Sequence, residues 1–468
     1  MALATTVLSV SGTALSNGRY PAASQLAIDP NDPKHLVVSA TFGFLDSRDE
    51  GRSFNWLCES AVGVAGEEGF DVVIAVTGNG NTVLGLFNGM ATTRDACTFQ
   101  MPSELVNHVI GDLSWRRSTP HDVIGYTVDN ITGGFVSKIV QSNDDGATWS
   151  EVGPPLPTSL LPLTIDLAPR DGNRIYLSAR SDTSKKYNSV LMRSDDGGAT
   201  FQSVDIPGTE LQRMAYIAAV HPTEPDRVYL RVLDDKDGLP ITVIKMSADG
   251  GRTFQDVFTG TGELFGFAIS PEGTEMAFGG PGDGLYVGAA DGSNLARRSD
   301  VQPTCLTWSP QGLYACADAK LAGFSIGRSL DSGATFQGLF KYQSICGQTA
   351  CSSKATSVCA AQWDKVALQL GGTCGASDAG GADAATDAKP GGGVADAVGG
   401  AGGQSMGESS GGCAVSRARC SPNAWSWLAG LVVALRWRRR GHDARHLAAT
   451  NGRRGLSWRR ALSVAGRR

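Results

Sequence analysis

Sequence signatures of several common enzyme classes are missing from this chain of 468 residues. It contains no P-loop, no HExxH zinc motif and no Rossmann fingerprint, so no motif supports a nucleotide hydrolase, a zinc protease or a dinucleotide-dependent enzyme. No pair of cysteines has the CxxC spacing of a zinc finger. Histidine occurs six times, and we expect each to be a turn or surface residue rather than a ligand: His35, His108, His121, His221, His442 and His446. We therefore predict neither a cofactor nor a metal site.

Helical periodicity and evenly spread positive charge are also lacking. Between residues 20 and 342 no stretch sustains an apolar period of 3.6, so no helix is expected there. The net charge is −5, but residues 436–468 hold eleven arginines and one aspartate, a net of +10, which leaves −15 on the rest. An acidic body disfavours nucleic-acid binding. A basic cluster directly after an apolar run is typical of a cytoplasmic stop signal.

What the chain does contain is a repeat. The phrase S-x-D-x-G-x-[ST]-[FW], here named the turn motif, occurs in five complete copies, around Asp49, Asp144, Asp196, Asp249 and Asp331. Two worn copies surround Asp95 and Asp291. The seven copies begin 40 to 53 residues apart, which is the period of a four-stranded propeller blade. Alternating apolar segments around Pro, Asp or Gly turns precede each copy and predict hairpins. We predict an all-β, seven-bladed β-propeller over residues 20–342.

Each residue type of the turn motif has a structural use. The aspartate can accept backbone N–H bonds within a tight turn, and the glycine permits a positive φ. The hydroxyls can tie two strands together, and the aromatic ring can fill the gap between strands or blades. We therefore interpret all seven aspartates as structural. Acidic turns such as SNDDG lack the spacing of a calcium loop, so solvated turns are the preferred interpretation over calcium sites.

The recurrence in register resembles the Asp-box (BNR) superfamily of propellers, which includes sialidases, sortilin-type receptors and xyloglucan hydrolases. The resemblance covers roughly 320 residues and implies the fold rather than a function, because that superfamily uses the box away from its active face. The stretch ATFGFLDSRDEGRSFNWLCES followed by TTRDACTFQ is similar to uncharacterised myxobacterial surface propellers.

Ten cysteines occur in local groups of even number, which favours disulfides over free thiols or metal ligands and hence an oxidising compartment. Cys58 and Cys97 end adjacent repeats, so we predict that they pair. Cys305 and Cys316 should pair across a hairpin of the last blade. Residues 343–374 form a Cys-rich segment, too short for its own core, that is expected to depend on two disulfides among Cys346, Cys351, Cys359 and Cys374.

The remainder of the chain predicts export and anchoring. Residues 375–412 are a Gly/Ala/Asp-rich, flexible linker. Residues 413–440 begin with Cys413, which follows Gly412, and continue with a short apolar helix over 424–435 and an arginine cluster. Residues 441–468 form a basic tail, either genuine or a misread frame. This layout resembles the MYXO-CTERM sorting signal, which implies processing at Cys413, with Cys420 as the weaker match, and retention at the cell surface. An ordinary membrane anchor is the alternative. The start lacks a positive n-region, so either export uses a weak signal or the true start lies upstream of Met1, and we favour the second.

Two functional hypotheses remain. The first is a surface module that binds an extracellular glycan or protein, or is structural, with a membrane contact through the C-terminal segment and no nucleic acid. The second is a sialidase-like or other glycoside hydrolase, which needs two carboxylates across a cleft. The Arg-Ile-Pro signature of the sialidases is absent, and Arg19 in GRYP lacks that context. The sequence favours the non-enzymatic module.

Overall fold

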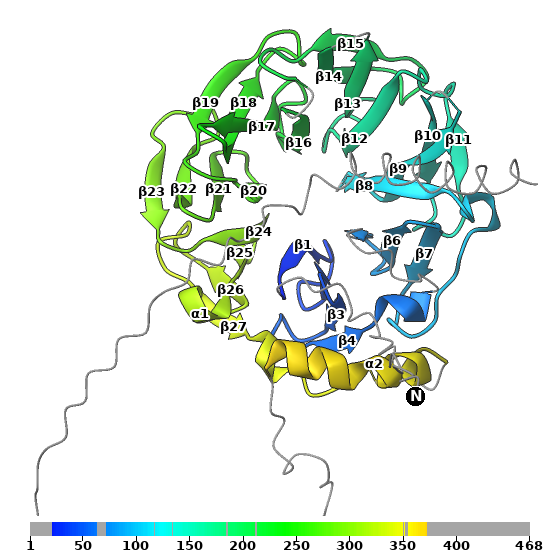
Figure 1. Ribbon diagram of the computed structural model, residues 1–468, viewed down its shortest axis with the longest axis vertical. Helices are drawn as coiled ribbons and strands as arrows, with labels where there is room; N and C mark the ends of the chain where they lie inside the picture. Colours follow the sequence, from blue (N-terminus) through cyan, green and yellow to red (C-terminus); the bar gives the residue numbers. More distant parts are fainter. Residues whose placement is uncertain are drawn as a thin grey trace, which may run out of the picture. The chain divides into compact units, whose positions relative to one another are not determined.

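The computed structural model of the chain describes residues 21–371, apart from 63–71, 117, 133, 184–185, 211–212, 350 and 352–353. These residues form seven antiparallel sheets arranged as blades around a ring, as predicted (Figure 1). In each sheet the strands follow one another in chain order, and the first strand lies nearest the centre. The predicted linker, Cys413, the apolar helix and the basic tail lie outside the described residues.

The first three blades contain eleven strands. Blade 1 consists of β1 (Ala23–Ile28), β2 (Leu36–Ala40), β3 (Gly43–Ser47) and β4 (Asn55–Leu57). Blade 2 consists of β5 (Val73–Val76), β6 (Thr82–Leu86) and β7 (Gly89–Thr93). Blade 3 consists of β8 (Val109–Arg116), β9 (Thr119–Ile131), β10 (Gly134–Ser142) and β11 (Ser150–Val152). Blade 2 carries a worn turn motif, and its outermost position holds only a single bridge, between Thr92 and Gln100.

The other four blades have four strands each. Blade 4 consists of β12 (Leu160–Leu167), β13 (Ile175–Thr183), β14 (Lys186–Ser194) and β15 (Gln202–Asp205). Blade 5 consists of β16 (Ala215–Val220), β17 (Val228–Lys236), β18 (Leu239–Ser247) and β19 (Gln255–Thr259). Blade 6 consists of β20 (Gly266–Ile269), β21 (Glu275–Gly280), β22 (Gly284–Ala289) and β23 (Ala296–Ser299). Blade 7 consists of β24 (Pro303–Ser309), β25 (Gly312–Ala317), β26 (Ile326–Ser329) and β27 (Gln337–Phe340).

The hydrophobic core lies between blades. One cluster joins blades 3 and 4 and includes Tyr126, Leu167 and Leu177, all buried. Other clusters join blades 2 and 3, blades 4 and 5, blades 5 and 6, and blades 6 and 7. Since alternate side chains of a strand point to opposite faces of its sheet, each blade has an apolar face for each of its two neighbours. The alternating pattern of the sequence therefore specifies the ring.

The turn motif links the third and fourth strands of a blade. In blade 3, Asp144 accepts hydrogen bonds from the Thr148 N–H at 2.8 Å and the Thr148 hydroxyl at 2.6 Å. The Gly146 N–H donates to the Ser142 hydroxyl at 2.8 Å, and that hydroxyl donates to Asp144. The other complete copies repeat these bonds around Asp49, Asp196, Asp249 and Asp331. Of the worn copies, Asp95 binds the backbone of Cys97 and Thr98, and Asp291 binds Ser293 alone.

Helices are few in the described part of the chain, but not absent, so the expectation of no helix before residue 342 was wrong. A single turn, α1 (Ala319–Ala322), connects β25 to β26 and is capped by Asp318 and Gly323. Short 3₁₀ turns lie at Glu59–Val62, Ser103–Leu105 and Tyr342–Ser344. These elements are too short to produce a helical period in the sequence. No described helix is long and apolar enough to cross a membrane.

The segment that follows blade 7 is a helix fastened to the propeller. Helix α2 (Lys354–Leu370) packs along blade 1 (Figure 1). Disulfides join Cys58 to Cys359 and Cys97 to Cys351, with Cα–Cα distances of 5.3 and 5.5 Å. The predicted Cys58–Cys97 bond was therefore wrong, and so was the prediction that Cys351 and Cys359 pair within the Cys-rich segment. Cys58 and Cys97 each pair instead with the returning segment, which contacts both blades. The Cys305–Cys316 bond is present across the β24–β25 hairpin, as predicted. Cys346 is also disulfide-bonded, whereas Cys374 lies outside the described residues.

Candidate functional site

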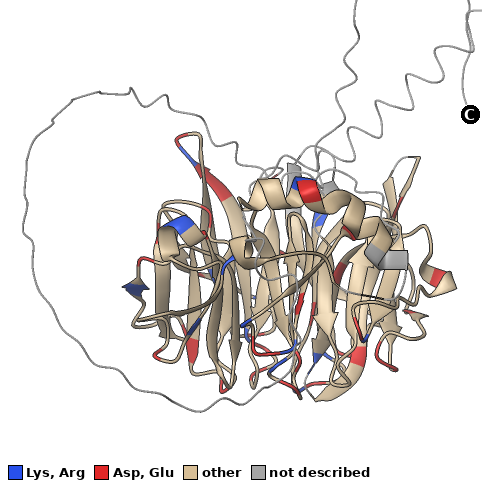
Figure 2. Cartoon of the chain, turned by 90° about the horizontal axis from the view of Figure 1, so that it is seen from below, with Lys and Arg blue, Asp and Glu red and all other residues tan. Residues whose placement is uncertain are grey.

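The two faces of the propeller differ. The turns between second and third strands lie on one face, here named the hairpin face, and the turn motifs lie on the opposite, motif face. Figure 2 shows acidic and basic residues on the turns of the motif face, and helix α2 lies along the outer edge of the ring, nearer the other face. All seven aspartates predicted from the repeat thus belong to the motif face. Their side chains are committed to bonds within their own turns, so the structure does not gather them into a common site.

The hairpin face carries three long hairpins on adjacent blades. Strands β10, β13, β14, β17 and β18 each have nine residues, and β9 has thirteen. The corresponding strands of blades 1, 2 and 6 have only five or six. At about 3.4 Å per residue, three extra residues extend a hairpin by about 10 Å. Blades 3, 4 and 5 therefore form a raised wall on one side of this face.

Exposed apolar side chains lie at the ends of two of these hairpins. Leu239, beside the β17–β18 turn, is 67% exposed, and Ile131 at the end of β9 is 41% exposed. The β17–β18 tip also carries Asp234, Asp235 and Asp237 around Lys236, and Arg213 forms an ion pair with Asp234 at 2.7 Å.

Below the wall, two carboxylates connect the inner strands of blades 3 and 4. The Ile165 N–H of β12 donates to Asp112 Oδ2 at 2.9 Å, and the Leu113 N–H donates to Asp112 Oδ1 at 2.9 Å. Across the same boundary, the Ser114 hydroxyl donates to Asp166 Oδ1 at 2.7 Å. Both carboxylates are half-buried between the strands.

Burial sets the protonation of this pair. It raises the pKa of Asp112 to about 7, helped by the negative charge of Asp166 and opposed by the Ile165 and Leu113 N–H bonds. It raises the pKa of Asp166 to about 6, opposed by the bonds to Ser114 and Leu167. Burial therefore favours the protonated form of both carboxyl groups.

Aromatic hydroxyls and cations continue this cluster toward blade 6. Tyr216 of β16 is buried, which raises its pKa to about 12, although the nearby Arg231 and Arg180 guanidinium groups oppose the rise. Arg231 donates to the carbonyls of Leu264 and Phe265 at 2.9 and 2.7 Å, which links blade 5 to blade 6. Burial raises the pKa of Glu263, and the charge of Arg231 opposes this rise.

This cluster was not identified from the sequence. Its members are single residues on separate strands, and no spacing rule connects Asp112 with Asp166 or Tyr216 with Arg231. The sequence offered one signal: in the alternating strand pattern, Asp112 and Asp166 occupy inward positions, where apolar or small residues are usual.

Two of the histidines are buried rather than at the surface. His35 and His221 are buried in the turns between first and second strands. His35 lies 3.0 Å from Asp46, and His221 Nε2 lies 2.8 Å from the Gly273 carbonyl oxygen. Among the described residues, no three His, Cys, Asp or Glu side chains are grouped to hold a metal ion.

No family model matches the chain, and no curated protein is similar to it in sequence. Solved structures share its architecture. An ancestral GH74 enzyme matches with a TM-score of 0.51 and 14% identity, over 69% of this chain and 46% of the enzyme, so the chain spans less than half of that enzyme's length. Hydrazine synthase of Kuenenia stuttgartiensis matches with a TM-score of 0.45 and 12% identity, over 70% and 99% of the two chains. An α-L-arabinofuranosidase of Fusarium graminearum matches with a TM-score of 0.35 and 17% identity, over 49% and 80%. The first likeness shows the seven-bladed propeller fold and nothing further.

Proposed function

We propose that this protein is an exported β-propeller, held at the cell surface, that binds an extracellular glycan or protein on its hairpin face over blades 3 to 5. The observation that carries the proposal is the wall of three long hairpins, with Leu239 exposed at the tip of β17–β18. Neighbouring hairpins of this length exceed what the blades need to close the ring. The extra length supplies additional surface on which a ligand can lie.

Export is supported by the disulfides. Two of them join residues that are separated by 301 and 254 positions in the chain, and a third closes the β24–β25 hairpin. Bonds of this kind form and persist in oxidising compartments, whereas cytosolic thiols are kept reduced. Anchoring rests on the sequence from Cys413 to Arg440, whose resemblance to a sorting signal motivates that part of the proposal.

Binding is favoured over catalysis by the use of the carboxylates. Both oxygens of Asp112 already accept N–H bonds, one from the next blade, and one oxygen of Asp166 accepts the Ser114 hydroxyl. The hydrogen bonds of Asp112 and Asp166 therefore connect blades 3 and 4, which is a structural role. Arg231 is likewise directed at carbonyls of blade 6.

A glycan array with a register-preserving variant tests the binding face. Removal of residues 234–235 and 240–241 shortens the β17–β18 hairpin by two cross-strand pairs and leaves the inward and outward alternation unchanged. We expect the variant to fold and its apparent affinity for any bound glycan to fall roughly tenfold or more, because Leu239 and the charged tip retract. Asp291→Asn, on the motif face, is the matched control and should bind as the wild type does. Equal binding by the shortened variant and the wild type would remove the hairpin face as the site.

One observation favours a second function, glycoside hydrolysis. Asp112 and Asp166 lie on adjacent inner strands and both have a raised pKa, and a glycoside hydrolase needs a pair of carboxyl groups of which one donates a proton. Polysaccharide incubated with the wild type, Asp112→Asn and Asp166→Asn separates the two functions. Reducing ends released by the wild type and by neither variant would replace the binding proposal with the hydrolase.

A further inference from the structure

The ring closes without an exchanged strand. Every described sheet consists of consecutive strands, so blade 7 comes wholly from one end of the propeller and blade 1 wholly from the other. Between their inner strands, the Thr307 hydroxyl donates to the Leu26 carbonyl at 2.5 Å. No backbone ladder of the described residues crosses this junction, here named the seam.

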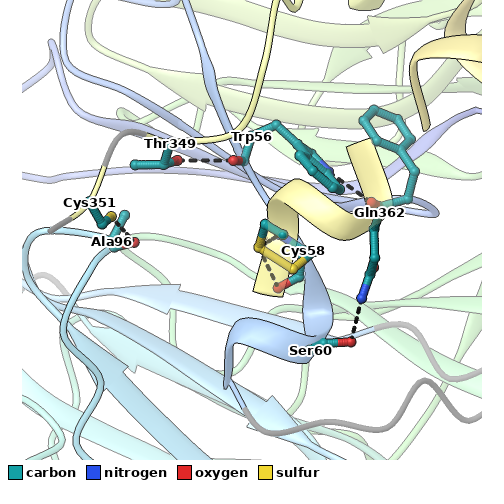
Figure 3. The surroundings of a disulfide bond; sticks show 9 residues. Trp56, Cys58, Ser60, Ala96, Thr349, Cys351 and Gln362 are labelled. Atoms are coloured by element: carbon teal, nitrogen blue, oxygen red, sulfur yellow. Dashed lines mark hydrogen bonds between the residues drawn. A yellow bond between two sulfur atoms is a disulfide. The ribbon is translucent and has the colours of Figure 1, made fainter. Parts of the chain in front are cut away.

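The chain that leaves blade 7 crosses the seam and attaches to blade 1. Gln348 forms a parallel bridge with Trp56 of β4. The Thr349 N–H and hydroxyl both donate to the Trp56 carbonyl, at 2.7 and 3.0 Å (Figure 3). The segment then reaches blade 2, where Cys351 is bonded to Cys97.

Helix α2 then runs back over blade 1. Cys359 on this helix is bonded to Cys58, and the Gln362 amide donates to the Ser60 hydroxyl at 2.8 Å (Figure 3). The Trp363 ring lies 5.5 Å from that of Trp56. At the end of the helix, Leu370 lines a cavity of about 350 Å³ together with Lys320 and Tyr342 of the blade 7 region. The segment therefore spans blades 7, 1 and 2 on both its outward and its returning path.

We propose that residues 342–371 are a covalent clasp that closes the ring in place of an exchanged strand, and that a dithiol reductant detaches this clasp from blades 1 and 2 in two steps. Of the two bonds that attach it to these blades, Cys97–Cys351 opens first and Cys58–Cys359 second. The clasp is the only described feature that joins blade 7 covalently to blades 1 and 2 other than the chain through the remaining blades.

The order follows from access to the sulfur atoms. Cys97 and Cys351 are both half-buried, whereas Cys58 and Cys359 are 1% and 0% exposed. A thiolate must reach a disulfide sulfur to attack it, so a dithiol attacks the more exposed bond directly and the buried bond only after the segment loosens. In each step one disulfide becomes two thiols, while the dithiol loses two electrons and two protons and becomes a cyclic disulfide.

Timed reduction followed by hydrogen exchange tests the clasp. Folded, oxidised protein is treated with dithiothreitol, and samples are alkylated at intervals and mapped by mass spectrometry. We expect Cys97 and Cys351 to be alkylated roughly tenfold faster than Cys58 and Cys359. When all four are alkylated, amide exchange in β1 and β24 should rise roughly tenfold or more, whereas β12 and β16, far from the seam, should keep their protection.

Cysteine variants assign the effect to the clasp. A variant with all four of these cysteines changed to alanine should show the same fast exchange at the seam without any reductant. Cys305→Ala with Cys316→Ala removes a disulfide within blade 7 and should leave exchange in β1 unchanged. Earlier reduction of the buried bond overturns the order of opening. Unchanged exchange in β1 and β24 after both bonds are open overturns the clasp itself.

Discussion

The aspartates of the turn motif differ in the number of hydrogen bonds that they accept. Asp144 binds the Thr148 N–H and hydroxyl and the Ser142 hydroxyl, whereas Asp291 binds only Ser293. Burial opposes ionisation of Asp144, but these bonds hold the pKa of its carboxyl below the usual value. When a carboxylate that accepts several hydrogen bonds is removed, the N–H and O–H groups that donated to it lose their protein acceptor and must bond to water instead.

Asp144→Ala should lower the free energy of unfolding by about 1 kcal/mol, since the turn is exposed and water replaces part of the lost bonding. Asp291→Ala should have a smaller effect, because its turn contains fewer bonds to lose. Urea unfolding followed by tryptophan fluorescence measures both. Equal and negligible changes in the two variants would contradict a structural role for the complete motif.

Asp112 should make stability depend on pH in the opposite direction to an ordinary salt-bridged carboxylate. Its folded pKa of about 7 lies above its usual value near 3.8, so the folded state keeps a proton that the unfolded chain releases. Stability therefore falls as pH rises from about 4 to about 7, and the penalty is complete above the folded pKa. Asp112→Asn should show a shallower fall than the wild type over that window, measured by urea unfolding at several pH values. A slope equal to that of the wild type would mean that Asp112 does not titrate there.

At the level of whole elements, the turn motif also provides contacts between one blade and the next. A Cβ atom at Gly146 would lie 2.8 Å from both Thr92 Oγ1 and Val83 Cγ2 of blade 2. The Thr92 hydroxyl in turn donates to the Gly146 carbonyl at 3.0 Å. Glycines at the same motif position meet the preceding blade elsewhere: Gly198 meets Val152, Gly251 meets Leu191 and Gly333 meets Leu285. The glycine of the motif thus serves blade contact as well as turn geometry.

Gly146→Ala should therefore destabilise the propeller by about 2–4 kcal/mol, through a positive φ and a clash with blade 2. Gly238 is the matched control, because its φ of +79° resembles the +84° of Gly146 but nothing lies within 4 Å of its Cβ position. Gly238→Ala should cost only about 1 kcal/mol. Thermal melts of the two variants compare them directly, and similar losses would show that backbone strain alone requires the glycine.

The sequence predicted the elements better than their connections. Period-2 alternation and the turn motif locate the hairpins, because strand pairing within a blade joins neighbours in the chain. Helix α2 was missed although its buried Cys359, Val366 and Leu370 recur at helical spacing, because the segment was interpreted from its cysteines alone. The Cys58–Cys359 pairing was missed because the two residues are 301 positions apart and no local pattern records which blades the last segment crosses. The same limit hides the Asp112–Asp166 pair.

For the whole molecule, the acidic propeller and the basic C-terminal tail are expected to lie on opposite sides of a membrane. The body carries −15 and residues 436–468 carry +10, and the linker over 375–412 gives reach. Positive charge after an apolar run favours a cytoplasmic C-terminus. The apolar run over 424–435 is shorter than the ~20 residues of a simple span, which suits a signal that is cut better than one that stays.

Deletion of residues 413–468 should therefore release folded propeller into the medium, because the clasp ends at residue 371 and needs nothing beyond it for its described contacts. Cys413→Ala should leave a longer, membrane-retained form, since processing at this cysteine would be blocked. Cell fractionation with blotting against the propeller measures both size and location. Normal maturation of Cys413→Ala together with failure of Cys420→Ala would assign processing to Cys420. Retention of an uncut chain in the wild type and in both variants would instead indicate a plain anchor, in which the arginine cluster alone sets the orientation.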